Sequence, residues 1–465
     1  MTNKYAKLVF AFAIVAALVT VPISTSNYAY ADDDNKSTGF NALKKSAECI
    51  AETAGSANPW HLPSGWNQKI ITSEDISQAV FENLPDMNQQ NPVKIDMPAP
   101  LVTLGAPAGQ VQVGQLVYAT HEVGSGGSVS VQDLKTGIVG KLAERTDWNR
   151  LDGLRWTPWG TLLPAEEASN TAGPDKDPDV PTAVHGLFYE IDPETGSGID
   201  NGLAGQNNGA RPQLGSMPHE GIAIDKWNNI YVIDEFNGGA IYRFVPNADP
   251  SIAGYIGTGT LYALRVDSGN ADTLTGNTAE WIALGAGTDP EIDARTAANE
   301  VGATNYNRPE DAEIIGNILY VATTGDRTVL AIQLKEMVSD SFKVTKYIKG
   351  GEGAANDKPG KTFESPDNLA VNGKELWIVE DNGPSDIWRS KPDNSGMIAK
   401  QVDLFASNED CNSEGTGILW GIGPLKGKLL VNHQHAGPFN EPLDDEIGPD
   451  HRHVIYKTDF KNGDD

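Results

Sequence analysis

The sequence is poor in basic residues and in cysteine. Its 465 residues include 35 lysines and arginines against 63 aspartates and glutamates, which give a net charge of −28 at pH 7. A nucleic-acid-binding protein or a sensor of anionic membranes needs the opposite sign of charge, so neither class fits. Cys49 and Cys411 have no partner at metal-site spacing, which excludes a Cys-type zinc site. In an oxidising compartment they could form a disulfide; two unpaired buried thiols are the alternative.

Common catalytic signatures and long helices are also missing. The sequence has no Walker loop, no GxSxG elbow, no HExxH and no EF-hand spacing. Helical periodicity is confined to short pieces such as residues 75–83. With 49 glycines and 28 prolines, the composition favours many short strands joined by turns.

The only long apolar run stands near the start of the chain. Lys4 and Lys7 precede 12 apolar residues from Leu8 to Val19, and Ala29-Tyr30-Ala31 follows. This run is too short for a comfortable membrane span but has the form of a signal peptide. We therefore expect a Sec-type signal peptide at residues 1–31 and a secreted, cell-surface or periplasmic-like location. An uncleaved N-terminal anchor is the alternative.

From about residue 110 a pattern recurs six times. An apolar strand, a turn, a second strand, an acid, a glycine-rich turn and a third strand follow one another, most clearly at residues 221–247, 311–334 and 368–393. Four-stranded units at periods near 40–50 residues are typical of β-propellers. We predict an all-β fold, with a six-bladed β-propeller at residues 110–465 and an N-terminal tail and strap at residues 32–109. Another large all-β fold is the alternative.

Acidic residues mark two points of this repeat. One set stands at or near the start of the first strand of a copy: Asp152, Glu220, Glu310, Asp367 and Glu414. A second polar set ends the second strand: Glu122, Glu166–Glu167, Asp234–Glu235, Asp326, Glu380–Asp381 and His433-Gln434-His435. Because the first and second strands are antiparallel, the start of one lies beside the end of the other. Both sets should therefore lie on one face of the propeller, at the mouth of its central channel.

Clustered carboxylates need a counter-charge. Two of them about 5 Å apart repel by roughly 3 kcal/mol at an effective dielectric of 20, so either several are protonated or cations are bound. Oxygen ligands at this density suit calcium, and His219, His433 and His435 could add a transition metal. The alternative is that these acids are caps and turn formers. We take six carboxylates as candidate metal ligands: Asp152, Glu166, Glu220, Glu310, Asp367 and Glu380.

Two further residues are candidates for catalysis. Arg308, two residues before Glu310, could grip an oxyanion such as phosphate with two parallel hydrogen bonds. A salt bridge to Glu310 or a neighbour is the alternative. His219, next to Glu220, could be an outer-shell ligand, an acid or base, or a buried histidine bonded to the backbone. We take Arg308 and His219 as the candidate catalytic residues.

Several of these segments resemble the PhoX-type alkaline phosphatases. The matching pieces include LDGLRWTPWGTLL at 151–163, HEGIAID at 219–225, YVIDE at 231–235, NRPEDAE at 307–313, SPDNLAV at 365–371 and HQHAG at 433–437. The resemblance covers roughly residues 110–460. It implies a six-bladed propeller with a calcium- and iron-containing centre that hydrolyses phosphate monoesters. It also implies metal ligands at Glu166, Glu220, Glu310 and Asp367, and a phosphate-binding role for Arg308.

One position departs from the family pattern. The family's phosphatases carry a cysteine just before the glutamate pair that follows the WGT motif, whereas this chain has Ala165. Alanine cannot ligate a metal, so we expect calcium as the cofactor and little or no iron. We therefore predict a secreted, calcium-dependent hydrolase of phosphate esters. Its expected partner is a small-molecule phosphate ester, with no nucleic acid and no membrane span in the mature chain, and we expect a monomer.

Two other functions stay open from the sequence. Paraoxonase-like and gluconolactonase-like propellers are similar around Pro366-Asp367-Asn368, which would suit a calcium-dependent lactonase or esterase with His219 as the base. A lactonase has no need for an anion clamp, so Arg308 separates this hypothesis from the phosphatase. The third possibility is a non-catalytic calcium-binding propeller at the cell surface.

Overall fold

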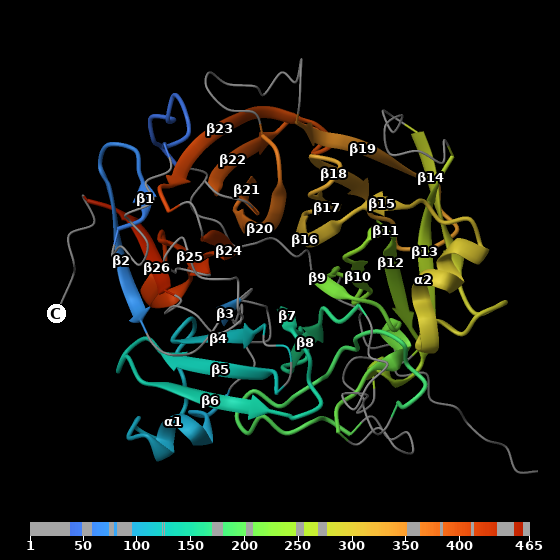
Figure 1. Ribbon diagram of the computed structural model, residues 1–465, viewed down its shortest axis with the longest axis horizontal. Helices are drawn as coiled ribbons and strands as arrows, with labels where there is room; N and C mark the ends of the chain where they lie inside the picture. Colours follow the sequence, from blue (N-terminus) through green and yellow to red (C-terminus); the bar gives the residue numbers. More distant parts are fainter. Residues whose placement is uncertain are drawn as a thin grey trace, which may run out of the picture.

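Short antiparallel strands build sheets that stand around a common centre, and edge strands such as β9 (His219–Ile224), β16 (Pro309–Ile315) and β20 (Pro366–Asn372) lie nearest to it (Figure 1). The computed structural model describes residues 38–48, 58–73, 79–80, 95–122, 124, 126–169, 180–200, 208–247, 255–267, 277–350, 363–381, 385–410, 413–434 and 451–458. The expected signal peptide, both cysteines and His435 lie outside these residues. The prediction of an all-β fold is confirmed, and the arrangement around a centre is that of a β-propeller.

The sheets follow one another in chain order around the centre. The first contains β3 (Ala79–Val80), β4 (Leu116–His121), β5 (Ser128–Asp133) and β6 (Val139–Glu144). The second pairs β7 (Leu151–Trp156) with β8 (Leu162–Glu166), and single bridges from Leu162 to Ile191 and from Ala165 to Phe188 extend it outward. A nine-stranded sheet then runs through β9 (His219–Ile224), β10 (Ile230–Asp234), β12 (Ile241–Pro246), β13 (Gly259–Val266), β14 (Asn277–Ala283), β19 (Phe342–Lys349), β18 (Thr328–Gln333), β17 (Ile318–Thr323) and β16 (Pro309–Ile315).

Two sheets complete the circuit, and both take in strands from the N-terminal part of the chain. One contains β20 (Pro366–Asn372), β21 (Glu375–Glu380), β22 (Asp386–Pro392), β23 (Ala399–Asn408) and β1 (Trp60–His61). The other contains β24 (Glu414–Trp420), β25 (Leu429–Gln434), β26 (His451–Lys457) and β2 (Trp66–Ser73). The N-terminal segment therefore adds edge strands to sheets that are built from the end of the chain.

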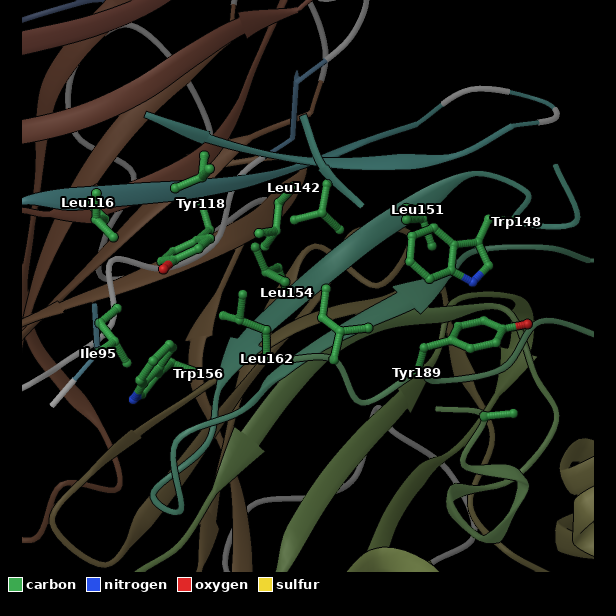
Figure 2. Packing of buried hydrophobic residues seen from close by; sticks show 14 of the residues in the cluster. Ile95, Leu116, Tyr118, Leu142, Trp148, Leu151, Leu154, Trp156, Leu162 and Tyr189 are labelled. Atoms are coloured by element: carbon green, nitrogen blue, oxygen red, sulfur yellow. The ribbon is translucent and has the colours of Figure 1, made fainter. Parts of the chain in front are cut away.

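Apolar clusters fill the space between neighbouring sheets. The cluster in Figure 2 joins β4 to β7, with Leu154 and Leu162 beside Trp156, and with the Trp148 ring 5.3 Å from the Tyr189 ring. Similar clusters lie between each of the following strand groups, and the last one joins β25 and β26 to β4. Because both faces of an inner strand pack against neighbours, β4 and β21 are buried along their whole length.

The described helices are short, and the sequence analysis missed the longer one. α1 covers Ala99–Thr103, and α2 covers Pro290–Glu300, where the sequence analysis named no helix; the backbone of α2 is non-helical at Asp293. Asp289 caps α2 by accepting a hydrogen bond from the Glu291 amide at 3.0 Å, and Pro290 opens the first turn, which is a standard start signal. Within 75–83, residues 79–80 form β3 rather than a helix. A short pairing of β11 (Asn237–Gly239) with β15 (Tyr306–Asn307) completes the strands.

None of the helices among the described residues is long and apolar enough to cross a membrane.

Candidate metal centre

The innermost strands bring the first acidic set together at the centre. β7, β9, β16, β20 and β24 lie next to one another in this order, and each carries its acid at or near its first residue. Glycine makes the close approach possible. A Cβ on Gly153 would stand 2.0 Å from the Glu220 carbonyl oxygen, and one on Gly221 would stand 2.4 Å from the Ala312 amide nitrogen. The glycines that follow Asp152 and Glu220 thus allow these backbones to approach closely enough for their acids to meet.

Backbone bulges aim these acids. The pairing register shifts between Leu151 and Leu154 on β7, and between Pro309 and Ala312 on β16. A third shift lies between Pro366 and Leu369 on β20, so that Asp152, Glu310 and Asp367 each fall inside an irregular stretch. A bulge re-aims side chains and is common next to functional sites.

In the second polar set, the structure separates the two members of each acidic pair. Glu166 is buried within its sheet, where its carboxylate accepts hydrogen bonds from the Asn149 amide at 2.9 Å and the Leu187 amide at 3.0 Å. Its neighbour Glu167 instead contributes a carboxylate oxygen to a group with Glu122 and Asp152, in which these oxygens lie within 4.8 Å of one another. Glu166 therefore lies outside this group and Glu167 lies in it, while the choice of Glu166 as a metal ligand stays a prediction.

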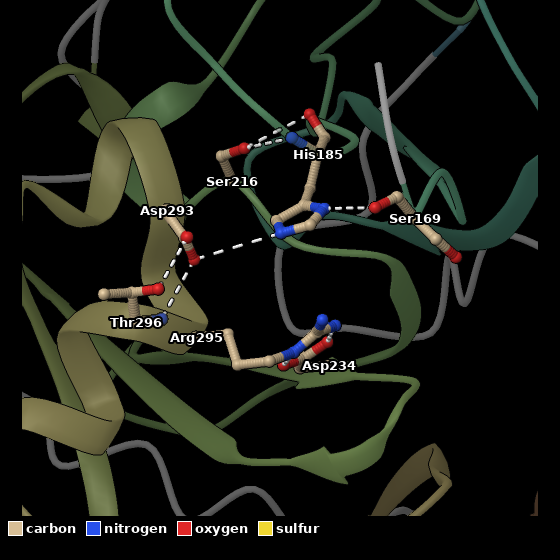
Figure 3. A network of polar contacts seen from close by, with 7 residues as sticks. All are labelled: Ser169, His185, Ser216, Asp234, Asp293, Arg295 and Thr296. Atoms are coloured by element: carbon tan, nitrogen blue, oxygen red, sulfur yellow. Dashed lines mark hydrogen bonds and ion pairs between the residues drawn. The ribbon is translucent and has the colours of Figure 1, made fainter. Parts of the chain in front are cut away.

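The pairs on β10 and β21 behave in the same way. Asp234 is buried and binds Arg295 with both carboxylate oxygens, one of them 2.7 Å from the Arg295 Nε (Figure 3). Glu235, the next residue, forms a second compact group with Glu220 and Glu310, again within 4.8 Å. Figure 3 also shows His185 beside this pair, with its ring between Ser169 and Asp293.

Of Glu380 and Asp381, the second lies in the central group. Oε1 of Glu380 accepts the Glu364 amide at 2.5 Å and the Ser365 amide at 3.2 Å, which places this oxygen on the backbone of its own blade. Asp381 lies 3.3 Å from Arg308 and belongs to the central group. Asp326 of the same polar set accepts the Asn307 amide at 3.0 Å within a turn.

We call the assembled group the carboxylate ring. Its members each carry a carboxylate that touches or electrostatically perturbs another member: Glu122, Asp152, Glu167, Glu220, Glu235, Glu310, Asp367, Asp381 and Glu414. Of the six predicted ligands, Asp152, Glu220, Glu310 and Asp367 lie in it. Glu122 and Gln434 connect across the first and last sheets through a 3.1 Å hydrogen bond.

Burial and mutual repulsion make this ring reluctant to ionise. Burial raises the pKa of Glu220 well above its usual range, and the charges of Asp152, Asp367 and Glu310 raise it further. For the pKa of Glu167, burial again has the largest effect, followed by the hydrogen bond and the charge of Glu235. Each nearby pair of ionised carboxylates costs about 3 kcal/mol at an effective dielectric of 20. The ring therefore needs either protons or bound cations.

The donor set fits a hard, oxygen-preferring cation. Oδ1 of Asp152 is buried and accepts no hydrogen bond from the described residues, so it is available to an ion. Calcium takes six to eight oxygen ligands in flexible geometry, which matches a ring made of carboxylates. Ala165, by contrast, is buried among apolar side chains such as Leu163 and Phe188 and offers no ligand atom. A thiolate-bound iron therefore finds no ligand at this position.

Arg308 lies among the ring carboxylates and keeps part of its side chain in solvent. Its guanidinium lies 2.8 Å from Glu235, 3.2 Å from Glu310 and 3.3 Å from Asp381, while 45% of the side chain is exposed. Burial lowers the pKa of Arg308, but the three carboxylates more than offset this and raise it. The backbone of Arg308 is left-handed, with φ of 49°, a strained conformation that is common at functional sites.

A second arginine has the same backbone geometry and was missed in the sequence. Arg150 stands two residues before Asp152, just as Arg308 stands two residues before Glu310, and its φ is also 49°. The carbonyl of Arg150 accepts the Glu167 amide at 2.8 Å, and that of Arg308 accepts the Thr324 amide at 2.9 Å. Arg150 also lowers the pKa of Glu122, partly offsetting the larger effect of burial. The ring thus has two exposed arginines at equivalent positions, and the shared spacing from the acid was the available signal.

His219 has a structural environment rather than a catalytic one. It is fully buried, its Nε2 lies 3.0 Å from the Gly215 carbonyl oxygen, and its ring centroid is 4.0 Å from that of Phe188. Burial lowers the pKa of His219 to about 3, so the imidazole is neutral and Nε2 can donate to that carbonyl. His219 therefore lies against Phe188 and the Gly215 carbonyl, and its role in catalysis stays a prediction.

Comparisons with known proteins give one family match and several distant structural matches. The family model described as "Alkaline phosphatase PhoX" matches residues 153–437. No curated protein matches the chain. Among solved structures, a luciferin-regenerating enzyme is 11% identical, covers 85% of this chain and 96% of its own, and has a TM-score of 0.43. A "putative oxidoreductase (glucose dehydrogenase)" from a Thermus species is 12% identical, covers 84% of this chain and 100% of its own, and has a TM-score of 0.42. The PQQ-bound aldose sugar dehydrogenase of Streptomyces coelicolor is 12% identical, covers 85% of this chain and 100% of its own, and has a TM-score of 0.39.

These low identities and TM-scores carry no argument about function. The family match does, because it spans more than half of the chain and includes ring residues Glu220, Glu310 and Asp367 together with Arg308. The chain belongs to the alkaline phosphatase PhoX family.

Proposed function

We propose that this protein hydrolyses phosphate esters at the carboxylate ring, with calcium ions held there. The observation that carries the proposal is the position of Arg308, a half-exposed cation at the edge of a buried group of acids. A lactonase would have no use for such an anion clamp. The family membership supports a phosphatase-type hydrolase.

Arg308 is suited to bind and orient the phosphate. A guanidinium has five N–H donors in a planar fork, so it can contact carboxylates and still present donors to an incoming phosphate. Glu235 and Asp381 hold the guanidinium from neighbouring sheets, and its left-handed backbone is fixed by hydrogen bonds to Phe236 and Thr324. The side chain is therefore oriented before the substrate arrives, which lowers the entropic cost of binding.

The ring carboxylates Asp152, Glu167, Glu220, Glu235 and Glu310 would hold the cations. Bound calcium would neutralise the ring and polarise a phosphoryl oxygen. Asn368 contacts a ring carboxylate. Its amide nitrogen lies 3.4 Å from Glu220, while its amide oxygen accepts hydrogen bonds from the Thr416 hydroxyl and the Gly417 amide. This arrangement fixes the amide orientation, so that the NH₂ group faces the acid.

We also propose a number of blades, a boundary of the N-terminal strap, a cellular location and an oligomeric state. Six apolar clusters between successive strand groups support a count of six blades, with the second blade made partly of single bridges. The boundary between strap and propeller near residue 110, a secreted or cell-surface location and a monomeric state remain our proposals. The substrate we propose is a small phosphate ester.

The test is hydrolysis of a phosphomonoester, a phosphodiester and an aryl lactone by the calcium-loaded protein. Arg308→Lys keeps the charge but loses the planar fork, so we expect phosphomonoester hydrolysis to fall about a hundredfold. Glu310→Gln should do worse, because it removes a ring carboxylate that also contacts Arg308. Loss of phosphomonoester hydrolysis in both variants would support the phosphatase.

Two outcomes would replace this proposal. Lactone turnover that survives Arg308→Lys but is lost in Glu310→Gln would indicate a lactonase. If the unaltered protein turned over none of the three substrates, the non-catalytic calcium-binding propeller would become the leading explanation.

A further inference from the structure

Three histidines gather on one face of the last sheet, away from the carboxylate ring. His433 on β25 lies directly opposite His451 on β26, and His453 follows two residues along the same strand. Alternate residues of a strand share a face, and cross-strand neighbours are close, so the three rings are brought together by the pairing itself. Their centroids lie 5.8 to 6.4 Å apart, with His453 nearly perpendicular to the other two rings. We call this group the histidine cluster.

The histidine cluster leaves ring nitrogens without partners. Both nitrogens of His453 are buried, as are Nδ1 of His433 and Nδ1 of His451, and none of the four has a hydrogen-bond partner among the described residues. Buried polar atoms almost always have such a partner, so four in one small group call for a ligand. Burial lowers the pKa of His453 to about 3 and also lowers that of His451. Their imidazoles are therefore neutral, which is the state that binds a metal.

His433 is held by polar groups on the side away from its free nitrogen. Its Nε2 contacts the Ser413 hydroxyl and lies 3.4 Å from an Asp410 carboxylate oxygen, while Nδ1 is the atom without a partner among the described residues. Asp410 is itself fixed, because its amide donates to the Asn408 side chain at 2.9 Å. The hydrogen-bond partner of Nε2 is thus the Ser413 hydroxyl, with the Asp410 carboxylate close by. Polar groups around one nitrogen of a histidine whose other nitrogen is free are typical of metal-ligating histidines in proteins.

We propose that His433, His451 and His453 bind a divalent first-row transition metal, with zinc as the best-fitting ion. Imidazole nitrogens suit zinc, copper and nickel, whereas calcium prefers oxygen. Imidazoles that share a tetrahedral zinc at about 2.0–2.1 Å have centroids about 5.2 Å apart. The rings of the histidine cluster thus need to close by about an ångström and turn about their side-chain torsions. Three histidines leave a fourth position for water or another ligand.

This metal site would be distinct from the carboxylate ring in both place and chemistry. His433 and Gln434 are consecutive on β25 and so face opposite ways: Gln434 bonds to Glu122 of the ring, while His433 contacts Asp410 and Ser413. One protein would therefore carry an oxygen site for calcium and a nitrogen site for zinc. The inference does not depend on phosphatase activity.

The experiment uses cobalt as a spectroscopic substitute for zinc. The full chain is stripped of metal, supplied with excess calcium to fill the carboxylate ring, and titrated with Co²⁺. We expect one Co²⁺ per chain with visible d–d bands of low coordination number, displaced stoichiometrically by Zn²⁺ and unaffected by further calcium. His453→Gln should weaken Co²⁺ binding at least a hundredfold, and Asp410→Asn by about 10- to 100-fold, because it loosens the carboxylate that orients His433.

Two controls locate the binding. His185→Gln changes a histidine outside the cluster, and Glu167→Gln changes a ring carboxylate; both should leave the cobalt bands unchanged. Absence of the bands in the unaltered protein would overturn the proposal and leave the cluster as a pocket for water. Bands that persist in both His453→Gln and Asp410→Asn would also overturn it. So would bands that disappear in Glu167→Gln, since these would belong to the ring. Asp410→Asn keeps the test decisive if His453→Gln does not fold.

Discussion

Two adjacent glutamates give the sharpest test of the carboxylate ring. Glu167 shares a group with Glu122 and Asp152, whereas Glu166 bonds to the Asn149 and Leu187 amides within its sheet. Glu166 is buried and Glu167 is half-buried, and the two carboxylates have the same chemistry. We predict that Glu→Gln at these two positions has opposite effects on the metal-free protein.

The magnitudes follow from the surroundings. In the metal-free protein, Glu167→Gln removes one of several charges that repel by about 3 kcal/mol per ionised pair. Partial protonation already relieves some of this repulsion, so we expect stabilisation by about 1 to 3 kcal/mol. Glu166→Gln leaves one backbone N–H facing an amide NH₂ group, which should destabilise the protein by about 1 to 3 kcal/mol.

Calcium should change the effect of the substitution at Glu167 only. Saturation at 100 times the dissociation constant stabilises a folded protein by about 2.7 kcal/mol, and loss of a ligand forfeits part of this. Calcium should therefore stabilise Glu167→Gln less than it stabilises the unaltered protein, while the effect of Glu166→Gln should be the same with and without calcium.

The assay is thermal unfolding of the three proteins with calcium and after exhaustive chelation, combined with calcium binding by calorimetry. If Glu167→Gln destabilised the metal-free protein as much as Glu166→Gln, the ring acids would be caps held by hydrogen bonds. The reasoning from mutual repulsion would then be refuted.

Further predictions follow from the same site. Exhaustive chelation should lower the melting temperature by several degrees, and an unchanged melt would remove the calcium hypothesis. Without metal, stability should fall as pH rises above about 4, by up to about 1.4 kcal/mol per pH unit for each titrating group. Stability falls because burial and neighbouring charges raise the pKa of Glu220 and Asp367 in the folded state, which therefore binds more protons than the unfolded chain. If the free energy of unfolding of the metal-free protein rose with pH instead, this prediction would be contradicted. Arg150→Ala should weaken inhibition by inorganic phosphate about tenfold if Arg150 assists Arg308, whereas an unchanged inhibition constant would make Arg150 a structural residue. Elemental analysis should find calcium and little iron, because Ala165 supplies no thiolate, and stoichiometric iron would show that other ligands replace it.

The sequence by itself was sufficient for the all-β fold class and for recognising that acids recur at the strand ends. Repeated apolar strands with glycine-rich turns predicted an all-β fold, because period and turn chemistry are local properties of the chain. The acids that open the inner strands, such as Asp152 and Glu310, could also be recognised, since antiparallel pairing fixes which strand ends meet. α2 was overlooked although Asp289 and Pro290 are standard start signals. It is short, its backbone is non-helical at Asp293, and its buried residues are alanines, so its apolar periodicity is weak.

Only the tertiary structure decided which acid of each pair reaches the centre. Glu166 and Glu167 are adjacent in the sequence, and nothing in the local pattern separates them. Their roles depend on neighbours that are distant in the sequence: Glu166 accepts the Asn149 and Leu187 amides, whereas Glu167, just beyond the end of β8, lies beside Glu122 and Asp152. The histidine cluster could not be predicted from the sequence either, since His433 comes close to His451 and His453 only through the pairing of β25 with β26. Local pattern placed the charges along the chain, but long-range register determined which side chains share a site.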